Sequence, residues 1–211
     1  MKLPSLYAIV DADAVVRTGW QPLDLAAAYL RGGARFLQLR AKSMPGAELL
    51  ATASAVVQLA HRHQARVIIN DRADIARLAG ADGVHVGQED LPPAAVRAIV
   101  GDTALVGLST HTTEQVDRAI REPVSYLAVG PIFDTATKAT GYEHVGLEMV
   151  RDAARRATAQ GLPLVAIGGI TIESAASVLD AGASSVAIIS DLLTTGDPEA
   201  RVRAYIERLA R

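Results

Sequence analysis

Short apolar runs recur along the chain and alternate with longer segments that show helical spacing. Several runs, such as Val-Ile-Ile at residues 67–69, are continuously apolar, which is typical of strands buried on both faces of a parallel sheet. Between the runs, apolar residues three and four positions apart indicate helices that pack on one side. The pattern predicts eight strands, at residues 6–10, 35–39, 66–69, 83–86, 104–108, 125–129, 163–167 and 184–188.

Eight strand–helix units in 211 residues leave about 26 residues for each unit, close to the compact limit of a (β/α)8 barrel. A doubly wound open sheet is the alternative, because the pattern of one chain does not show whether a sheet closes. No Gly-x-Gly-x-x-Gly turn follows the first run, which disfavours that alternative. No linker or low-complexity stretch interrupts the rhythm. We therefore predict an α/β fold, a (β/α)8 TIM barrel, as a single domain of residues 1–211.

Composition narrows the class of protein. Half of the residues are apolar and 21% are charged, so a sizeable core is expected. The formal net charge of −2 disfavours a broad nucleic-acid surface, which needs a net basic face. Cysteine is absent, which excludes disulfides and thiolate chemistry. No membrane span or export signal is visible, so the expected location is the cytoplasm.

Polar residues follow the predicted strands, where the loops of a parallel barrel build its site. Gln38, Arg40 and Lys42 alternate out of the second strand, so all three side chains face the same way. The other strand ends contribute Asp11, Asn70, Asp71, Asp90, Ser109, His111, Thr135, Thr137, Lys138, Gly168, Gly169 and Ser190. The strand ends on the opposite side carry no comparable set. We interpret these residues as one site.

These residue types favour binding of phosphorylated ligands. Arg40, Lys42 and Lys138 supply cations for phosphate, and Asp71 with Asp90 could share one Mg²⁺. The glycines and serine after the last two strands occupy the usual phosphate position of barrels. Two phosphorylated ligands would fit, one of them a diphosphate.

Simpler interpretations stay open for single residues. Asp90 before Leu-Pro-Pro could be a helix N-cap, as could Asn70 with Asp71, and the paired glycines could serve a turn alone. The histidines do not indicate a catalytic base. His85 lies within a predicted strand as a core residue, and His111 is the histidine best placed to contact substrate.

An ordered set of motifs makes the chain resemble the thiamine-phosphate synthase family from residue 6 to residue 190. The motifs are Leu-Tyr-Ala-Ile-Val-Asp at 6–11, Gln-Leu-Arg-Ala-Lys at 38–42, Ile-Asn-Asp-Arg at 69–72, Asp-Gly-Val-His-Val-Gly-Gln-Glu-Asp-Leu at 82–91, Gly-Leu-Ser at 107–109, Val-Gly-Pro-Ile-Phe at 129–133 with Thr135 to Lys138, Ile-Gly-Gly-Ile at 167–170 and Ile-Ser at 189–190.

The resemblance implies a Mg²⁺-dependent transferase. It would join 4-amino-2-methyl-5-hydroxymethylpyrimidine diphosphate to 4-methyl-5-(2-phosphoethyl)thiazole, or its carboxylated form, giving thiamine phosphate and pyrophosphate. The family's pattern assigns the diphosphate substrate to Gln38, Arg40, Lys42, Asn70, Ser109 and Lys138. It assigns Mg²⁺ to Asp71 and Asp90, and the thiazole phosphate to Thr135, Thr137, Gly169, Ile189 and Ser190. Arg40, Lys42, Lys138 and Ser109 would serve the chemical step.

Three positions depart from that family's pattern. Asp134 stands where proline is common, Asp191 where a small residue is common, and residues 139–145 lack the usual Pro/Gly-rich sequence. Two other functions remain as alternatives: a thiazole tautomerase of similar fold, which carries a histidine in place of Pro131, and a noncatalytic phosphate-binding barrel. The expected partners are small molecules, with no nucleic acid and no membrane, and a homo-oligomer is compatible with the sequence.

Overall fold

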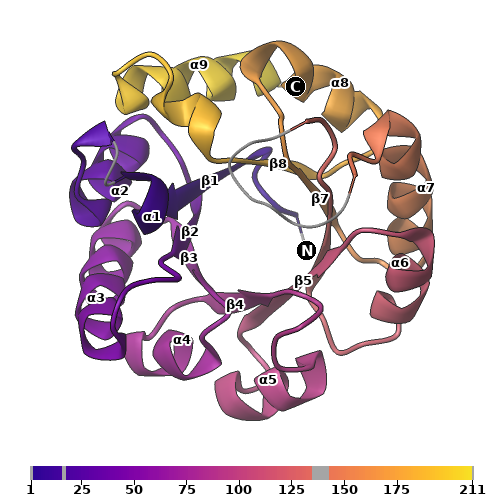
Figure 1. The fold of residues 1–211 in the computed structure, drawn as a ribbon, viewed down its shortest axis with the longest axis horizontal. Helices are drawn as coiled ribbons and strands as arrows, with labels where there is room; N and C mark the ends of the chain where they lie inside the picture. Colours follow the sequence, from indigo (N-terminus) through magenta and orange to yellow (C-terminus); the bar gives the residue numbers. More distant parts are fainter. Residues whose placement is uncertain (1, 16–17, 135–142, 211) are drawn as a thin grey trace.

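The structure, a computed structural model, describes residues 2–15, 18–134 and 143–210. Eight parallel strands form a closed barrel in which each strand pairs with its neighbours in sequence and β8 pairs with β1 (Figure 1). The strands are β1 (Leu6–Asp11), β2 (Phe36–Arg40), β3 (Arg66–Asn70), β4 (Gly83–Val86), β5 (Leu105–Thr110), β6 (Tyr126–Val129), β7 (Leu164–Ile167) and β8 (Ser185–Ile188). The predicted barrel is confirmed, and the doubly wound alternative is wrong.

Helices surround the barrel as an outer ring (Figure 1). They are α1 (Ala12–Val15), α2 (Pro22–Arg31), α3 (Gly46–Arg62), α4 (Ala73–Ala79), α5 (Pro93–Val100), α6 (Thr113–Ala119), α7 (Gly146–Ala159), α8 (Ile172–Asp180), the 3₁₀ helix η2 (Ser190–Leu193) and α9 (Pro198–Leu209). Their apolar faces pack on the outward-facing strand residues and form the larger hydrophobic core. In α3, for example, the residues spaced at helical intervals from Leu49 to Ala60 are buried.

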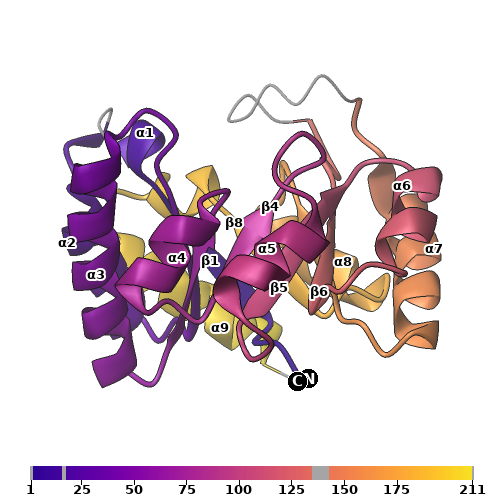
Figure 2. The ribbon, with the colours of Figure 1, turned by 90° about the horizontal axis from the view of Figure 1, so that it is seen from below.

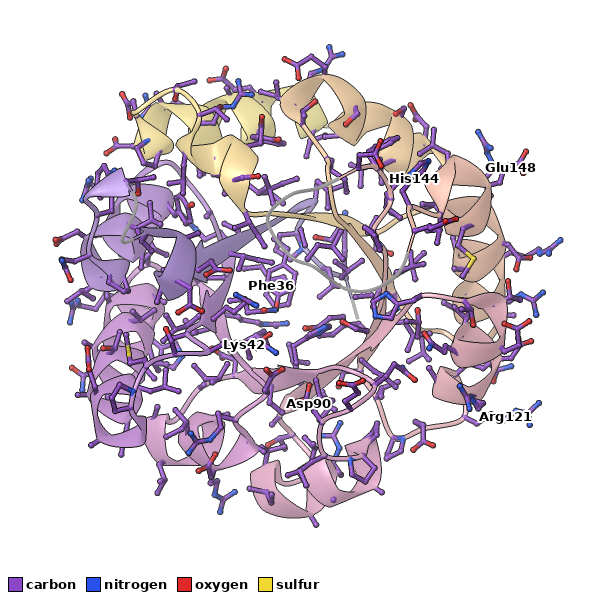
Figure 3. The ribbon with its side chains drawn as sticks, in the orientation of Figure 1. Phe36, Lys42, Asp90, Arg121, His144 and Glu148 are labelled. Atoms are coloured by element: carbon purple, nitrogen blue, oxygen red, sulfur yellow. The ribbon has the colours of Figure 1, made fainter. Side chains whose placement is uncertain are left out.

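A second core fills the inside of the barrel. Alternate strand residues point inward, because side chains of a strand alternate between its two faces. Tyr7, Phe36 and Tyr126 pack there together with Ile9 and Ile68. The rings of Tyr7 and Phe36 stack with their centroids 4.1 Å apart, and Figure 3 shows Phe36 inside the ring of strands. Because these side chains fill the interior, a ligand can bind at an end of the barrel but not within it.

The helix ends test some of the simpler sequence interpretations. Asp197 caps α9, since its side chain accepts a hydrogen bond from the amide of Ala200 at 3.0 Å. Asp90 does not cap α5, whose N-cap is Pro92, and the N-cap of α4 is Arg72. Asp90, Asn70 and Asp71 are therefore not N-caps of these helices.

The strands all point toward one end of the barrel, and α1 lies at this end because it directly follows β1. The two chain termini lie at the opposite end (Figure 2). Residues that follow the strands thus meet at one rim, well separated from the termini. Among the described helices, none is long and apolar enough to cross a membrane.

Candidate active site

The carboxyl ends of the strands surround a cavity. Seven of the residues that the family's pattern assigns to the substrates line it: Gln38, Arg40, Asn70, Ser109, Gly169, Ile189 and Ser190. They come from β2, β3 and β5 and from the segments that follow β7 and β8. Residues up to 152 positions apart in sequence thus share one concave surface. Four other residues that the sequence placed in the same site do not line it: Asp11, Lys42, Asp71 and Asp90.

An acidic pair lies at the ends of β3 and β4. The Asp90 carboxyl group lies close enough to Asp71 to raise its pKa, and Lys42 Nζ lies 3.2 Å from Asp71 Oδ2. Asp90 is oriented by the amide of Gly87, which donates to its Oδ2 at 2.7 Å. Figure 3 shows Lys42 and Asp90 at the inner rim of the barrel mouth. Three side chains from three different loops therefore meet at one point.

Burial and the neighbouring Asp90 carboxyl group raise the pKa of Asp71, and the Lys42 ammonium partly offsets this. Asp71 also has a left-handed backbone, with φ of 61°, although residues other than glycine rarely adopt it. Its amide donates to the carbonyl of His85 at 2.7 Å, which holds this conformation. The strained backbone and the crowding of two carboxyl groups both cost free energy, and a cation bound between the carboxylates would offset their repulsion.

Arg40, the last residue of β2, is held by carboxylates. Its Nη1 contacts Asp11 Oδ2 at 2.6 Å and lies 3.7 Å from Asp13 Oδ2. Asp11 is buried, and its Oδ1 accepts the amides of Asp13 and Ala14, each at 3.1 Å. This network fixes the guanidinium at the cavity wall, where its planar set of donors suits phosphate oxygens.

The two glycines after β7 allow a close approach of two loops. Gly168 and Gly169 have φ of 102° and 65°, in the region that favours glycine. A Cβ on Gly169 would lie 2.5 Å from the carbonyl oxygen of Asp134. The glycines therefore let the segment after β7 pack against the segment after β6, beside Ser190 at the cavity wall.

Comparison with known proteins identifies the family. The family model for thiamine monophosphate synthase matches residues 6–192. The chain belongs to the thiamine monophosphate synthase family. The resemblance drawn from the motifs is thereby confirmed, and the protein is an enzyme of thiamine biosynthesis, a transferase that forms thiamine phosphate.

Two relatives illustrate the similarity. A thiamine-phosphate synthase of Koribacter versatilis (strain Ellin345) is 45% identical over 214 residues, covering 99% of this chain and 97% of the relative. A thiamine-phosphate synthase of Roseiflexus castenholzii (strain DSM 13941 / HLO8) is 41% identical over 206 residues, covering 98% and 88%. These alignments span nearly the whole of both chains.

Solved structures show the same fold. The thiamine phosphate pyrophosphorylase from Pyrococcus furiosus superposes with a TM-score of 0.86 at 28% identity, covering 99% of this chain and 98% of the other. A 3-hexulose-6-phosphate synthase superposes with a TM-score of 0.71 at 21% identity, which shows a shared fold alone.

The two aspartates that depart from the usual family sequence have local partners. Asp191 pairs with Arg201 Nη2 at 2.8 Å and accepts a hydrogen bond from Tyr205, so its charge is balanced by α9. Asp134 contacts His144 Nδ1 at 2.9 Å, and both side chains are largely exposed. Thr135, Thr137 and Lys138 lie outside the described residues, as do residues 139–142 of the unusual stretch.

Some residues line the cavity although the sequence analysis did not place them in the site. Tyr7, Ile9 and Val165 line it from within the strands, as does His85, which was predicted to be a core residue. His111 lines it too, in agreement with its position after a strand. The signal for the missed residues was available: Tyr7 and Ile9 precede Asp11 at intervals of two, so all three share the inward face.

Proposed function

We propose that this cavity binds 4-amino-2-methyl-5-hydroxymethylpyrimidine diphosphate together with 4-methyl-5-(2-phosphoethyl)thiazole, or its carboxylated form, and joins them with Mg²⁺. Gln38, Asn70 and Ser109 would hold the pyrimidine, and Arg40, Lys42 and Lys138 its diphosphate. Gly169, Ile189 and Ser190, with Thr135 and Thr137, would hold the thiazole phosphate. The observation that carries the proposal is the proximity of Asp71 to Asp90 beside Lys42.

The acidic pair fits Mg²⁺. Mg²⁺ prefers carboxylate oxygens, typically takes one or two of them, and completes its shell with water and phosphate oxygens. Asp71 and Asp90 supply that number, and no group of three or more acidic or histidine ligands occurs among the described residues. A bound Mg²⁺ would stabilise the negative charge that develops on the departing diphosphate.

The cationic side chains at the barrel mouth would also stabilise the negative charge on the departing diphosphate. Arg40 presents its donors from a fixed position, because Asp11 and Asp13 hold it. Lys42, two residues after the end of β2, extends toward Asp71, so its ammonium group lies beside the proposed metal position. Donors placed in advance where charge develops lower the barrier, because they need no reorganisation during the reaction.

The bond changes need no general base. The bond between the pyrimidine methylene carbon and the diphosphate oxygen breaks, and its electron pair leaves with the diphosphate. The thiazole nitrogen then donates its lone pair to that carbon and carries no proton to lose. With the carboxylated thiazole, CO2 would also leave, and the carbon that carried it would take a proton from water. Accordingly, none of the five histidines is assigned as a base.

A direct assay tests the proposal. The purified protein is incubated with both substrates and Mg²⁺, and thiamine phosphate and pyrophosphate are quantified. We expect equal amounts of the two products, loss of both with EDTA, and recovery when Mg²⁺ is added in excess. Absence of thiamine phosphate under these conditions would contradict the proposal, and full turnover in EDTA would contradict the role of the metal.

A further inference from the structure

A chain of hydrogen bonds crosses the interior of the barrel directly beneath the cavity. Gln38 Nε2 donates to Tyr7 Oη at 2.7 Å, and Tyr7 Oη lies 3.2 Å from Tyr126 Oη. Tyr126 Oη lies 3.1 Å from His85 Nδ1, and His85 Nε2 lies 2.8 Å from Ser109 Oγ. The chain therefore links β2 to β5 through two tyrosines and a histidine. Both of its ends, Gln38 and Ser109, line the cavity.

The middle of this chain is built into the core. Tyr7 and Tyr126 are each 1% exposed or less, and His85 is 8% exposed. The rings of His85 and Tyr126 stack, with centroids 5.6 Å apart. Gly107 makes room for them, because a Cβ there would lie 2.2 Å from Tyr126 Cζ and 2.4 Å from His85 Nδ1. The geometry of the chain is thus fixed by packing.

The number of protons on each group determines which group donates and which accepts at each hydrogen bond between Gln38 and Ser109. Tyr7 accepts from Gln38 and has one proton of its own, for which Tyr126 is the acceptor within reach among the described residues. Tyr126 then donates to His85 Nδ1, so the imidazole proton sits on Nε2 and is donated to Ser109. Donation in the opposite direction would require the Gln38 amide to be turned over and the proton to sit on Nδ1.

We infer that Tyr7, Tyr126 and His85 are positioning residues that keep Ser109 a hydrogen-bond donor, and the Gln38 carbonyl a hydrogen-bond acceptor, toward the cavity. Ser109 accepts from His85 and keeps its own proton to donate to a ligand. Gln38 donates to Tyr7 and keeps Oε1 to accept. An aminopyrimidine offers the complementary pair, a ring nitrogen that accepts and an amino group that donates. This consequence for the substrate rests on the proposed function, whereas the direction of the chain does not.

Nitrogen NMR of histidine-labelled protein tests the direction, because the two imidazole tautomers differ in their ¹⁵N shifts and couplings. The His85 signal is assigned by its loss in His85→Gln. We expect the wild-type protein to hold His85 as the neutral Nε2–H tautomer. In Tyr126→Phe, which keeps the ring but removes the donor to Nδ1, we expect both tautomers to be populated. A wild-type Nδ1–H tautomer would overturn the inference, even if the variant does not fold.

Steady-state kinetics tests the consequence for the substrate. Tyr126→Phe should raise KM for the pyrimidine diphosphate about three- to tenfold, the effect of one lost hydrogen bond, and leave KM for the thiazole phosphate unchanged. Tyr29→Phe is the matched control, because Tyr29 is equally buried and its hydroxyl makes no hydrogen bond among the described residues. It should change neither KM nor the tautomer.

The outcomes separate the two proposals. An unchanged KM in folded Tyr126→Phe, or an equal rise for both substrates, would overturn the inferred positioning role. An Nε2–H tautomer in a wild-type protein that makes no thiamine phosphate would support the direction of the chain and contradict the proposed function.

Discussion

At the scale of single residues, the site combines side chains whose charges are unfavourable together. Within the part of the chain that the structure describes, Asp71 and Asp90 meet beside one ammonium group, Lys42, while Arg40 is already paired with Asp11. The described part of the mouth therefore has room for further positive charge. This arrangement favours a divalent cation at the acidic pair and a diphosphate beside the cations.

Removing one of the proposed charged contacts should slow turnover without unfolding the protein. We expect Asp71→Ala and Lys138→Ala each to reduce kcat by about 10²-fold or more, the usual effect of losing one transition-state contact. Asp74→Ala serves as a control, since Asp74 is an exposed acidic residue paired with Arg72. Initial rates of thiamine phosphate formation measure the effect, and near-normal turnover in either variant would contradict the assigned role.

At the scale of elements, much of the barrel could be predicted from the sequence. The strand at 83–86 was predicted with its observed bounds, and the strand at 35–39 was displaced by one residue from β2. The period of two correctly placed Gln38 and Arg40 on one face, and both line the cavity. Such short-range patterns are set by neighbouring residues, so the sequence displays them directly.

Other features could not be predicted because they depend on contacts across the barrel. Tyr7 and Tyr126 are 119 positions apart, and they meet only because the sheet closes. Likewise, the left-handed backbone of Asp71 depends on the carbonyl of His85 in the next strand. The sequence indicated that Asp71 belongs to the site, but it carried no sign of this conformation.

The packing of β5 against the interior rings gives a second prediction. Gly107→Ala should lower the free energy of unfolding by about 1–3 kcal/mol, because the new methyl group would overlap Tyr126 and His85. Gly46→Ala is the control: its Cβ would lie 3.8 Å from the nearest atom, at the start of α3, where alanine favours the helix. Urea denaturation measures both, and equal stability of the two variants would contradict the packing argument.

The attachment of α9 to η2 gives a third prediction. Arg201→Met should lower the free energy of unfolding by about 1–3 kcal/mol, because it leaves the mostly buried Asp191 carboxylate without its cation. Arg203→Met is matched to it on the same helix, but the pair of Arg203 with Glu199 is exposed and should contribute less than about 0.5 kcal/mol. An equal decrease in the free energy of unfolding of both variants would show that groups other than Arg201 stabilise the Asp191 carboxylate.

At the scale of the whole molecule, the proposed metal couples the site to stability. A ligand that binds the folded state alone stabilises it, so Mg²⁺ should raise Tm in wild type but not in Asp71→Asn. Because the pKa of Asp71 is raised, the folded state without metal binds a proton that the unfolded state has lost. Its stability therefore falls as pH rises through the interval between the two pKa values.

That proton competes with the metal, so stabilisation by Mg²⁺ should be larger at about pH 7 than at about pH 5. Thermal melts at both pH values, with and without Mg²⁺, measure the difference. An equal Tm increase at both pH values would show that Mg²⁺ binds away from Asp71.

The pairing of β8 with both β7 and β1 has a consequence for biosynthesis. On the ribosome, β1 is made first, but its partner on one edge is not available until residues 185–188 have been translated. The nascent polypeptide thus exposes an unpaired strand edge for most of its synthesis, and such edges attract other chains. Insertion of β8 between its two neighbours is the event that ends this period of vulnerability to aggregation.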